Sequence, residues 1–347
     1  MDDATYGSRI AIFGAGGFIG SHLVKGLLSR GYVKVVCLDL TEEKLRRVVP
    51  SRGYRFEYCD IRTDDAHVRR MIEESDIVFD LVAYANPIVY MERPVDVVDL
   101  NLFDNLKIVE HCAQLHKTLI QFSTCEVYGK TGGSPLPFSE DTTDLILGPV
   151  SSHRWIYSCA KQLLERIIHA RGLRNELKYI IIRPFNIVGP EMDYLVRSRE
   201  DGVPRVFPGF LSALLYDQMM QVVDGGARKR TFIYVDDAIE AILVILDNLH
   251  RVKNEIINIG NPNNEISIRG LAQLMTDLYE EISGTKPDAP IVDVPAHRFY
   301  GDGYDDSDRR IPDVTKLTKL GWQPRYDLEE TLRRSIRYYC EKADLRT

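Results

Sequence analysis

A glycine-rich turn between a short apolar run and a helical pattern constrains the fold of this chain more than any other feature. Residues 9–13 have the length and composition of a buried strand, residues 14–20 read GAGGFIG, and residues 21–30 show helical periodicity. Glycines in this context permit a tight turn and let backbone N–H groups approach a pyrophosphate at the helix start. The pattern predicts a dinucleotide-binding turn formed by Gly14, Gly17, Phe18, Ile19 and Gly20.

Strands and helices alternate along the first half of the chain. Further strands are expected at Val33–Leu38, Tyr54–Tyr58, Ile77–Ala83, Leu119–Ser123, Leu177–Ile182 and Glu255–Ile259. Helices are expected at Asp99–Leu115, Trp155–Arg171, Gly270–Glu280 and Leu328–Ala343, and at residues 236–241 with an aspartate as the N-terminal cap. This alternation predicts an α/β fold, a Rossmann-type doubly wound parallel sheet whose ligands bind at the carboxyl ends of the strands.

The second half is less regular, with loops expected at Gly189–Tyr194 and Glu200–Pro204. Because no linker or repeat separates the halves, the smaller substrate domain is expected to be interleaved with the first. We expect residues 1–185, with about 232–262, to bind the dinucleotide, and about 186–231 and 263–347 to bind the substrate.

Asp39 ends the second expected strand, nineteen positions after Gly20. A carboxylate at about this spacing hydrogen-bonds the adenosine ribose hydroxyls. It would repel a 2′-phosphate, so the sequence favours NAD over NADP.

Tyr157 and Lys161 are four residues apart and share one face of a helix. A nearby ammonium favours the phenolate form of tyrosine and lowers its pKa towards working range. Thr124 follows the expected strand at residues 119–123 and supplies a hydroxyl. Together the three groups could remove a proton from a sugar hydroxyl while hydride leaves the same carbon.

Bulk properties narrow the class of protein. The 347 residues are 44% hydrophobic and 27% charged, with a net charge of −7, which gives no reason to expect a nucleic-acid or membrane partner. The start is acidic and polar, no signal peptide or membrane span is evident, and the six cysteines lack zinc-type spacing. We expect a cytoplasmic protein without disulfides or a metal site.

Several runs resemble the nucleotide-sugar branch of the extended short-chain dehydrogenases over nearly the whole chain. The runs Arg154–Tyr157, Arg183–Asn186, Lys229–Phe232 and Phe299–Tyr304 are similar to UDP-glucuronate decarboxylases. The runs Ser123–Lys130, Glu200–Val206 and Tyr304–Asp313 resemble, more narrowly, UDP-apiose/UDP-xylose synthases.

The resemblance implies roles for particular residues. Cofactor contacts are implied for Asp60, Ile61, Ala83 and Asn101, besides the glycine turn, Asp39, Tyr157 and Lys161. Substrate contacts are implied for Tyr90, Arg154, Asn186, Arg205, Lys229, Arg230, Tyr304 and Arg310. Arg228, Lys229 and Arg230 offer cations for the diphosphate. Paired helices, Asp99–Leu115 and Trp155–Arg171, imply a homodimer.

The implied reaction starts from UDP-glucuronate. Oxidation at C4 would make a β-keto acid, carbon dioxide would leave, and hydride would return at the end, so NAD would stay tightly bound and be recycled. Arg310 matches the arginine beside the substrate carboxylate, and Asp306 would orient the sugar. Glu126 is placed to reprotonate the enolate, and Cys125 to serve the ring contraction that gives UDP-apiose with UDP-xylose.

Other readings remain open. Plant apiose synthases carry a second cysteine where this chain has Ala85. The bacterial decarboxylase of lipid A modification also lacks a cysteine at that position, but it has serine where this chain has Cys125. The alternatives are therefore a decarboxylase that stops at UDP-4-keto-pentose or UDP-xylose, a nucleotide-sugar 4-epimerase or dehydratase, and a non-catalytic NAD-sensing regulator.

Overall fold

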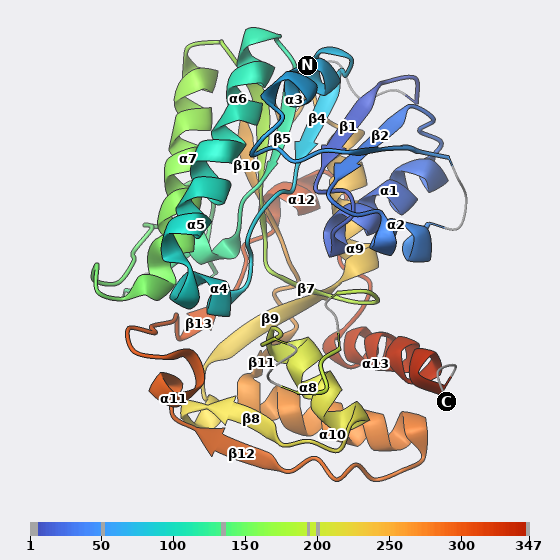
Figure 1. Ribbon diagram of the computed structural model, residues 1–347, viewed down its shortest axis with the longest axis vertical. Helices are drawn as coiled ribbons and strands as arrows, with labels where there is room; N and C mark the ends of the chain where they lie inside the picture. The colour runs from blue at the N-terminus through green and yellow to red at the C-terminus, as the bar shows by residue number, and fades with distance from the viewer. Residues whose placement is uncertain (1–5, 50–52, 133–136, 193–194, 199–201, 345–347) are drawn as a thin grey trace.

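A computed structural model of the chain describes residues 6–49, 53–132, 137–192, 195–198 and 202–344. It has an upper part built around a large sheet and a lower part of shorter elements, with the C-terminus at the end of helix α13 in the lower part (Figure 1). Asp193, Tyr194, Glu200 and Asp201, which belong to the expected loops, lie outside the described residues.

The large sheet has seven parallel strands in the order β10-β6-β5-β4-β1-β2-β3. Chain order therefore reverses at β1, the switch point at which doubly wound folds bind ligands. The predicted Rossmann-type sheet is confirmed. The strands are β1 (Ile10–Phe13), β2 (Val35–Asp39), β3 (Arg55–Tyr58), β4 (Ile77–Asp80), β5 (Thr118–Phe122), β6 (Lys178–Pro184) and β10 (Glu255–Ile259).

Helices cover both faces of this sheet because its strands are apolar on both sides. In β1, Ile10 and Ile12 join the core on the side of α1 and α9, whereas Ala11 and Phe13 join the core on the side of α3, α6 and α7. The helices of the upper part are α1 (Phe18–Arg30), α2 (Glu43–Val48), α3 (Asp65–Glu73), α4 (Pro87–Glu92), α5 (Pro94–Val98), α6 (Asn105–Gln114), α7 (Ile156–Leu173), α9 (Val235–Leu246) and α12 (Thr315–Lys319).

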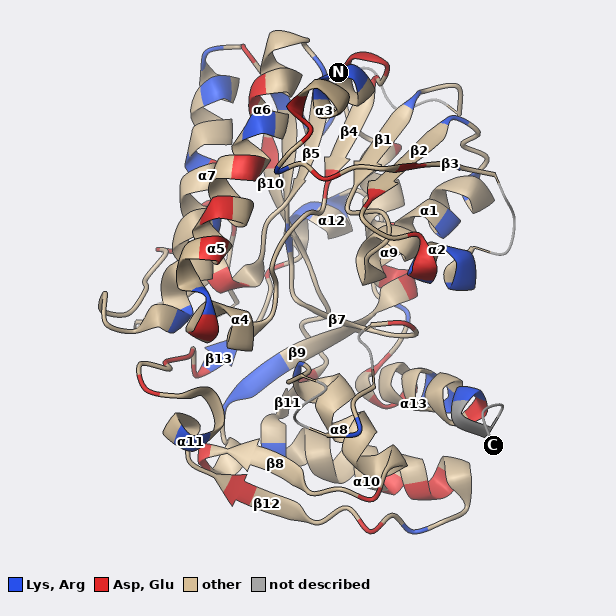
Figure 2. Cartoon of the chain, in the orientation of Figure 1, with Lys and Arg blue, Asp and Glu red and all other residues tan. Residues whose placement is uncertain are grey.

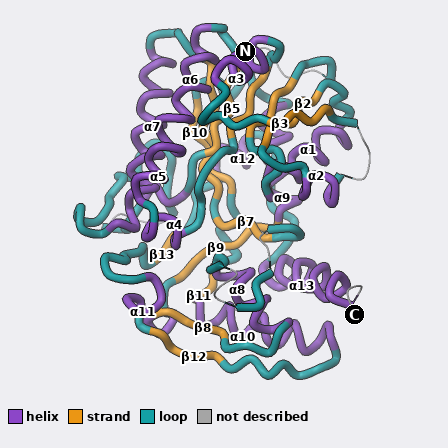
Figure 3. Tube along the Cα trace, viewed as in Figure 1, coloured by secondary structure: helices purple, strands orange, loops and turns teal. Residues whose placement is uncertain are grey.

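The lower part contains small sheets and helices that the sequence analysis only partly anticipated (Figure 3). Strand β9 pairs with β7, β11 and β13, and β8 pairs with β12. The strands are β7 (Asn186–Val188), β8 (Met220–Val223), β9 (Lys229–Tyr234), β11 (Glu265–Ser267), β12 (Ile291–Val294) and β13 (Arg309–Arg310). The helices are α8 (Val206–Leu215), α10 (Ile268–Ser283), α11 (Ala296–Tyr300) and α13 (Leu328–Asp344).

Several expected boundaries shift. The fourth strand ends at Asp80, not at Ala83, and the helix expected from Asp99 is preceded by α5 and begins with a π-helical segment, η1 (Asp99–Asp104). The expected aspartate cap of α9 is wrong. Tyr234 occupies the cap position, and the Asp237 carboxylate instead accepts the backbone N–H groups of Arg325 and Tyr326 at 2.8 and 3.0 Å.

Charges of both signs are interspersed over the helices of both parts, and β9 carries a short basic run (Figure 2). Among the described residues, none of the helices combines the length and apolar character needed to span a bilayer.

Candidate active site

A cavity of about 920 Å³ lies where the carboxyl ends of the large sheet face the lower part. Its lining includes Gly14, Leu81, Phe122 and Pro184, at the ends of β1, β4, β5 and β6. Most residues that the sequence singled out line this cavity: Gly14, Gly17, Phe18, Ile19, Gly20, Ala83, Tyr90, Thr124, Cys125, Glu126, Arg154, Tyr157, Asn186, Arg205, Arg230, Tyr304, Asp306 and Arg310.

The glycine turn forms one end of the cavity and fits a dinucleotide. Gly14 has φ of 83°, and a Cβ atom on Gly20 would lie 2.3 Å from the Gly14 carbonyl oxygen. Gly17 precedes α1, and no side chain caps the first turn of that helix. Its N–H groups and positive dipole end are therefore available to an anionic group such as a pyrophosphate.

Asp39 is tied to the glycine turn. Its carboxylate accepts the N–H groups of Gly16 at 2.8 Å and Leu40 at 2.6 Å. Burial raises the pKa of this carboxyl, and the N–H groups of Gly16, Leu40 and Thr41 oppose that effect. Asp39 does not itself line the cavity, but it fixes a negative charge beside the dinucleotide turn.

Asp60, Ile61 and Asn101, for which the resemblance implies cofactor contacts, do not line the cavity either. The Asp60 carboxylate pairs with the Arg62 guanidinium at 2.8 and 2.7 Å. Ile61 is buried, and the Asn101 amide bonds the backbone N–H and C=O of Tyr84 at 2.9 and 3.1 Å. Asn101 therefore positions the chain after β4 in this structure, and direct cofactor contacts of these residues stay a prediction.

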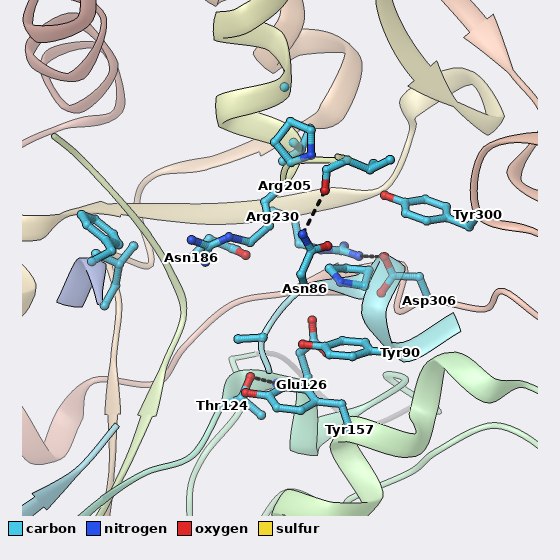
Figure 4. Close-up of a pocket in the computed structure, with 18 of the residues that line it drawn as sticks. Asn86, Tyr90, Thr124, Glu126, Tyr157, Asn186, Arg205, Arg230, Tyr300 and Asp306 are labelled. Atoms are coloured by element: carbon cyan, nitrogen blue, oxygen red, sulfur yellow. Dashed lines mark hydrogen bonds and ion pairs between the residues drawn. The ribbon is translucent and has the colours of Figure 1, made fainter. Parts of the chain in front are cut away.

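Thr124 and Tyr157 meet at the end of β5 (Figure 4). Thr124 caps the 3-10 turn η2 (Cys125–Tyr128), where its hydroxyl oxygen accepts the Glu126 N–H at 3.2 Å. The Tyr157 hydroxyl also hydrogen-bonds the Thr124 side chain. The Tyr157 ring stacks on Tyr90 with centroids 4.7 Å apart and planes 11° apart, which fixes the direction of the phenol.

Lys161 lies one turn further along α7 but does not line the cavity. Its ammonium donates to the Phe122 carbonyl at 3.1 Å and to the Asn105 amide oxygen at 3.4 Å. Burial raises the pKa of Tyr157, as does the Glu126 carboxylate. The net shift of the Tyr157 pKa in this structure is therefore upward, and a lowering of that pKa by the Lys161 ammonium stays a prediction.

Beyond Tyr90 lies a buried charge cluster, defined here as Glu126, Arg154, Arg230, Asp306 and Arg310. Arg154 forms two 2.7 Å bonds to Glu126. Asp306 accepts from Arg230 at 2.6 Å and from Arg310 at 2.7 Å, and Arg310 also lies 3.4 Å from Glu126. Three guanidinium groups face two carboxylates, so the charge cluster carries one net positive charge in the cavity wall.

The charge cluster holds its carboxylates ionised. Burial alone would raise the pKa of Asp306, but Arg230, Arg310 and Arg154 outweigh it and hold that pKa far below its usual range. The same balance lowers the pKa of Glu126. The Nε atoms of Arg154 and Arg310 are buried without a hydrogen-bond partner, which leaves donor capacity in the cluster.

Cys125 is buried among aromatic side chains of its own small core cluster and lines the cavity. Burial raises the pKa of its thiol, and Arg310 opposes that effect. Ala85 also lines the cavity, so the position at which plant apiose synthases carry a cysteine faces the same space.

The basic residues at the start of β9 do not all face the cavity. Arg230 faces the cavity, whereas Lys229 is exposed and lies 3.9 Å from Glu265. Successive residues of a strand point to opposite faces, so β9 cannot present both. Arg228 does line the cavity, as do Arg205 and the Asn186 amide, which donates to the Thr231 carbonyl at 2.9 Å.

Sequence reasoning missed part of the lining. Tyr300 stacks on Tyr304 with centroids 4.0 Å apart, and the Tyr304 hydroxyl donates to Asp306 at 3.1 Å. The Asn86 amide donates to the Val203 carbonyl at 2.9 Å (Figure 4). Further residues at the lower end are Arg197, Ser198, Phe210, Ser212, Gln218, Met219 and Gln221. The apolar run at residues 206–215 could have signalled α8, which carries two of them.

Among the described residues, no group of three or more His, Cys, Asp and Glu side chains could hold a metal ion. The arrangement instead offers a dinucleotide turn, a hydroxyl–phenol pair and a net positive cluster in one cavity. This combination suits redox chemistry at a hydroxyl-bearing carbon of an anionic substrate.

Comparison with known proteins identifies the class. Residues 10–260 match the model of the NAD dependent epimerase/dehydratase family, and the chain belongs to that family. NAD is accordingly its cofactor class, and a solved relative, the Thermus thermophilus UDP-glucose 4-epimerase in complex with NAD, is 26% identical with a TM-score of 0.78 over 96% of this chain and 99% of that one.

Particular relatives are more similar. UDP-D-apiose/UDP-D-xylose synthase 1 of Arabidopsis thaliana is 41% identical over 95% of this chain and 90% of its own length. The Oryza sativa synthase is 42% identical over 95% and 88%. The PbgP3 protein of Burkholderia pseudomallei is 32% identical, with a TM-score of 0.85 over 97% of this chain and 98% of that one. The resemblance drawn from the sequence is confirmed.

Proposed function

We propose that this protein catalyses NAD-dependent oxidative decarboxylation of UDP-glucuronate through a UDP-4-keto-pentose, with ring contraction and re-reduction to UDP-apiose and UDP-xylose. The observation that carries the proposal is the net positive charge cluster, which shares one cavity with Thr124 and Tyr157. The names of the relatives that are about 41% identical support the same substrate.

The first step needs a base at the C4 hydroxyl. NAD, when bound, accepts hydride from C4 and returns it at the end. The Tyr157 phenolate takes the hydroxyl proton, and the Thr124 hydroxyl bonds O4. The Tyr90 ring stacks on the Tyr157 ring and so fixes the orientation of the phenol. In the protein without ligands, the pKa of Tyr157 is raised, so cationic charge near the ring is needed to form phenolate at neutral pH.

The second step needs a cation for the substrate carboxylate. The charge cluster carries three guanidinium groups and two carboxylates, and a substrate carboxylate brings it to neutrality. Arg310 is the member assigned to the substrate carboxylate: Asp306 anchors one of its nitrogens at 2.7 Å, whereas its contact with Glu126 is long at 3.4 Å and its Nε has no hydrogen-bond partner. When the C5–carboxylate bond breaks, the electron pair passes to the C4 enolate, so the negative charge stays beside the same cations.

Later steps involve Glu126 and Cys125. Glu126 would relay a proton to the enolate carbon: its carboxylate is ionised in the free protein, so it first takes a proton from water and then passes it on. Arg154 orients this carboxylate through two bonds of 2.7 Å. Cys125 would exchange a proton during opening and closing of the C2–C3 bond in ring contraction. Ala85 in the cavity wall favours a second candidate, a UDP-glucuronate decarboxylase that stops at UDP-4-keto-pentose or UDP-xylose.

The test is incubation with UDP-glucuronate and NAD, with products followed by proton NMR and carbon dioxide measured in parallel. UDP-glucose, which lacks the carboxylate, is the matched control substrate. We expect carbon dioxide with UDP-apiose and UDP-xylose. Carbon dioxide with the 4-keto sugar or xylose alone would support the second candidate, and UDP-galacturonate without carbon dioxide would refute both.

The proposal extends to the cofactor and the division of the chain. NAD is recycled and held tightly, so it should copurify. Residues 1–185 with about 232–262 form the NAD-binding domain, and the remainder forms an interleaved UDP-sugar domain. We also propose a cytoplasmic location, supported by six cysteines that are all free.

We further propose a homodimer formed by the helices at residues 94–114 and 156–173. Large apolar side chains are exposed on these helices, Phe103 by 57% and Leu163 by 48%, beyond those that cover the sheet. Light scattering at micromolar concentration should give twice the chain mass. A monomer at that concentration would contradict the proposal.

A further inference from the structure

Four ionisable side chains lie buried behind Tyr157, away from the cavity. They are Asp80 at the end of β4, Lys161 and Glu165 on α7, and Arg183 on β6, and each is at most 4% exposed. Tyr157, Lys161 and Glu165 are spaced four residues apart on α7, so they follow one face of that helix from the cavity into the core.

The pairing within this group leaves Lys161 without an obvious anion. Arg183 donates to both Glu165 oxygens, at 3.1 and 2.6 Å, so the Glu165 charge is already matched. The Lys161 ammonium donates to two neutral oxygens, those of Phe122 and Asn105. Two cations and one paired carboxylate leave one positive charge to be balanced, and an uncompensated buried charge is costly.

Asp80 is held next to the same stretch of β5. It is the register partner of Gln121, whose amide donates to its carboxylate at 2.9 Å, and the Val82 N–H donates to it at 3.0 Å. Lys161 is bonded to the carbonyl of Phe122, the residue directly after Gln121. The carboxylate and the ammonium are thus anchored to adjacent residues of one strand.

Electrostatic interactions between the two groups agree with this placement. Burial raises the pKa of Asp80 and lowers the pKa of Lys161, and each group opposes the shift of the other. Glu165 also supports the charge of Lys161. The Asp80 charge also acts on Cys112 of α6: burial and Asp80 both raise the pKa of this thiol, so it adds no charge at neutral pH.

We propose that Asp80 is the buried counter-ion that keeps Lys161 protonated, which makes Asp80 a positioning residue for the base at Tyr157. The charges of the four buried groups support the assignment of Asp80 as counter-ion. The role of Asp80 as a positioning residue rests on the proposed function, because it requires Tyr157 to act as a base. Without Asp80, Lys161 would lose its proton more readily and would no longer favour phenolate.

The variant Asp80→Asn tests the proposal with little change of shape. The oxygen of the new amide can keep the Val82 N–H, and the buried Gln121 Oε1, which has no partner, can accept from its NH₂ after the Gln121 amide turns over. The matched control is Asp76→Asn, at the residue directly before β4, where an exposed carboxylate pairs with Arg9. Circular dichroism and thermal melting confirm folding of both.

The first readout is the charge of Lys161 itself. The protein carries ¹³C-labelled lysine, the Lys161 Cε signal is assigned by its loss in Lys161→Arg, and the signal is followed over pH without substrate. We expect wild-type Lys161 to stay charged through pH 7, its pKa to fall by about one unit or more in Asp80→Asn, and no change in Asp76→Asn. A wild-type signal that titrates below pH 7, or an Asp80→Asn pKa equal to wild type, would overturn the proposal.

The second readout is the pH dependence of NAD reduction in a single turnover with UDP-glucuronate. Loss of the ammonium should move the acid limb of the rate to higher pH in Asp80→Asn only, since phenolate then forms less readily. An unshifted limb beside a shifted Lys161 signal would remove the link to Tyr157. A wild type that never reduces NAD would refute the proposed function but leave the counter-ion assignment intact.

Discussion

Replacing Arg310 by alanine should separate substrate recognition from folding. In the free protein, Arg154 and Arg230 would still face Glu126 and Asp306, two charges against two, and Asp306 keeps its 2.6 Å bond to Arg230. The variant should therefore fold. In the complex, the substrate carboxylate would enter a cluster with no remaining net positive charge.

The size of the effect follows from the lost interaction. A hydrogen bond to a charged group contributes about 1.5–3 kcal/mol, so kcat/KM for carbon dioxide release should fall roughly ten- to a hundredfold. The assay measures carbon dioxide from UDP-glucuronate labelled at the carboxylate carbon, and calorimetry with UDP alone should show unchanged binding because UDP has no carboxylate.

The matched control for this experiment is the neighbouring residue. Arg309 is in the same short strand, but it is 45% exposed and pairs with Glu265 on the outer side. Arg309→Ala should release carbon dioxide at the wild-type rate. Wild-type kcat/KM in Arg310→Ala would refute the assignment of Arg310 to the substrate carboxylate.

Three further changes test other parts of the site. Tyr157→Phe keeps the stack on Tyr90 and should lower NAD reduction by about a hundredfold or more with UDP-glucuronate affinity unchanged, and undiminished turnover would remove Tyr157 from the mechanism. Cys125→Ser should still release carbon dioxide while the ratio of apiose to xylose falls in the NMR spectrum; a constant ratio would count against a role in ring contraction. NADP should bind more weakly than NAD in calorimetry, because Asp39 would face its 2′-phosphate, and equal affinity would show that assignment to be mistaken.

The sheet and one wall of the site were predictable because they follow local rules. The turn at residues 14–20 and the apolar runs along the chain predict the strands, the helices and their order from local sequence alone. Thr124 and Tyr157 could be assigned to the site because each lies at the end of such a strand or helix. Residues 255–259 were also expected as a strand, since five residues of mostly apolar character suffice for that inference.

The other parts of the fold and of the site could not be predicted, because they depend on contacts between segments that are distant in the sequence. Strand β13 has only two residues and exists because Arg309 and Arg310 pair with Lys229 and Arg230 of β9. The sequence showed three adjacent basic residues but not which face of β9 each would occupy. The structure separates Lys229, which is exposed, from Arg230, which lines the cavity, and a diphosphate contact of Lys229 stays a prediction. Likewise, the pKa of Tyr157 depends on burial and on Glu126, neither of which the four-residue spacing to Lys161 reveals.

The pairing of β10 with β6 and of β13 with β9 has a consequence for protein synthesis. A nascent chain cannot complete its large sheet until residue 259 has left the ribosome, and until then β6 lacks its β10 partner and exposes a row of unpaired backbone N–H and C=O groups. Arg310, which we propose as the partner of the substrate carboxylate, emerges later still, so a chain that stops before β13 lacks this residue and the partner strand of β9. Prematurely terminated chains of this length would be inactive and prone to aggregate, which makes them natural clients of chaperones and proteases.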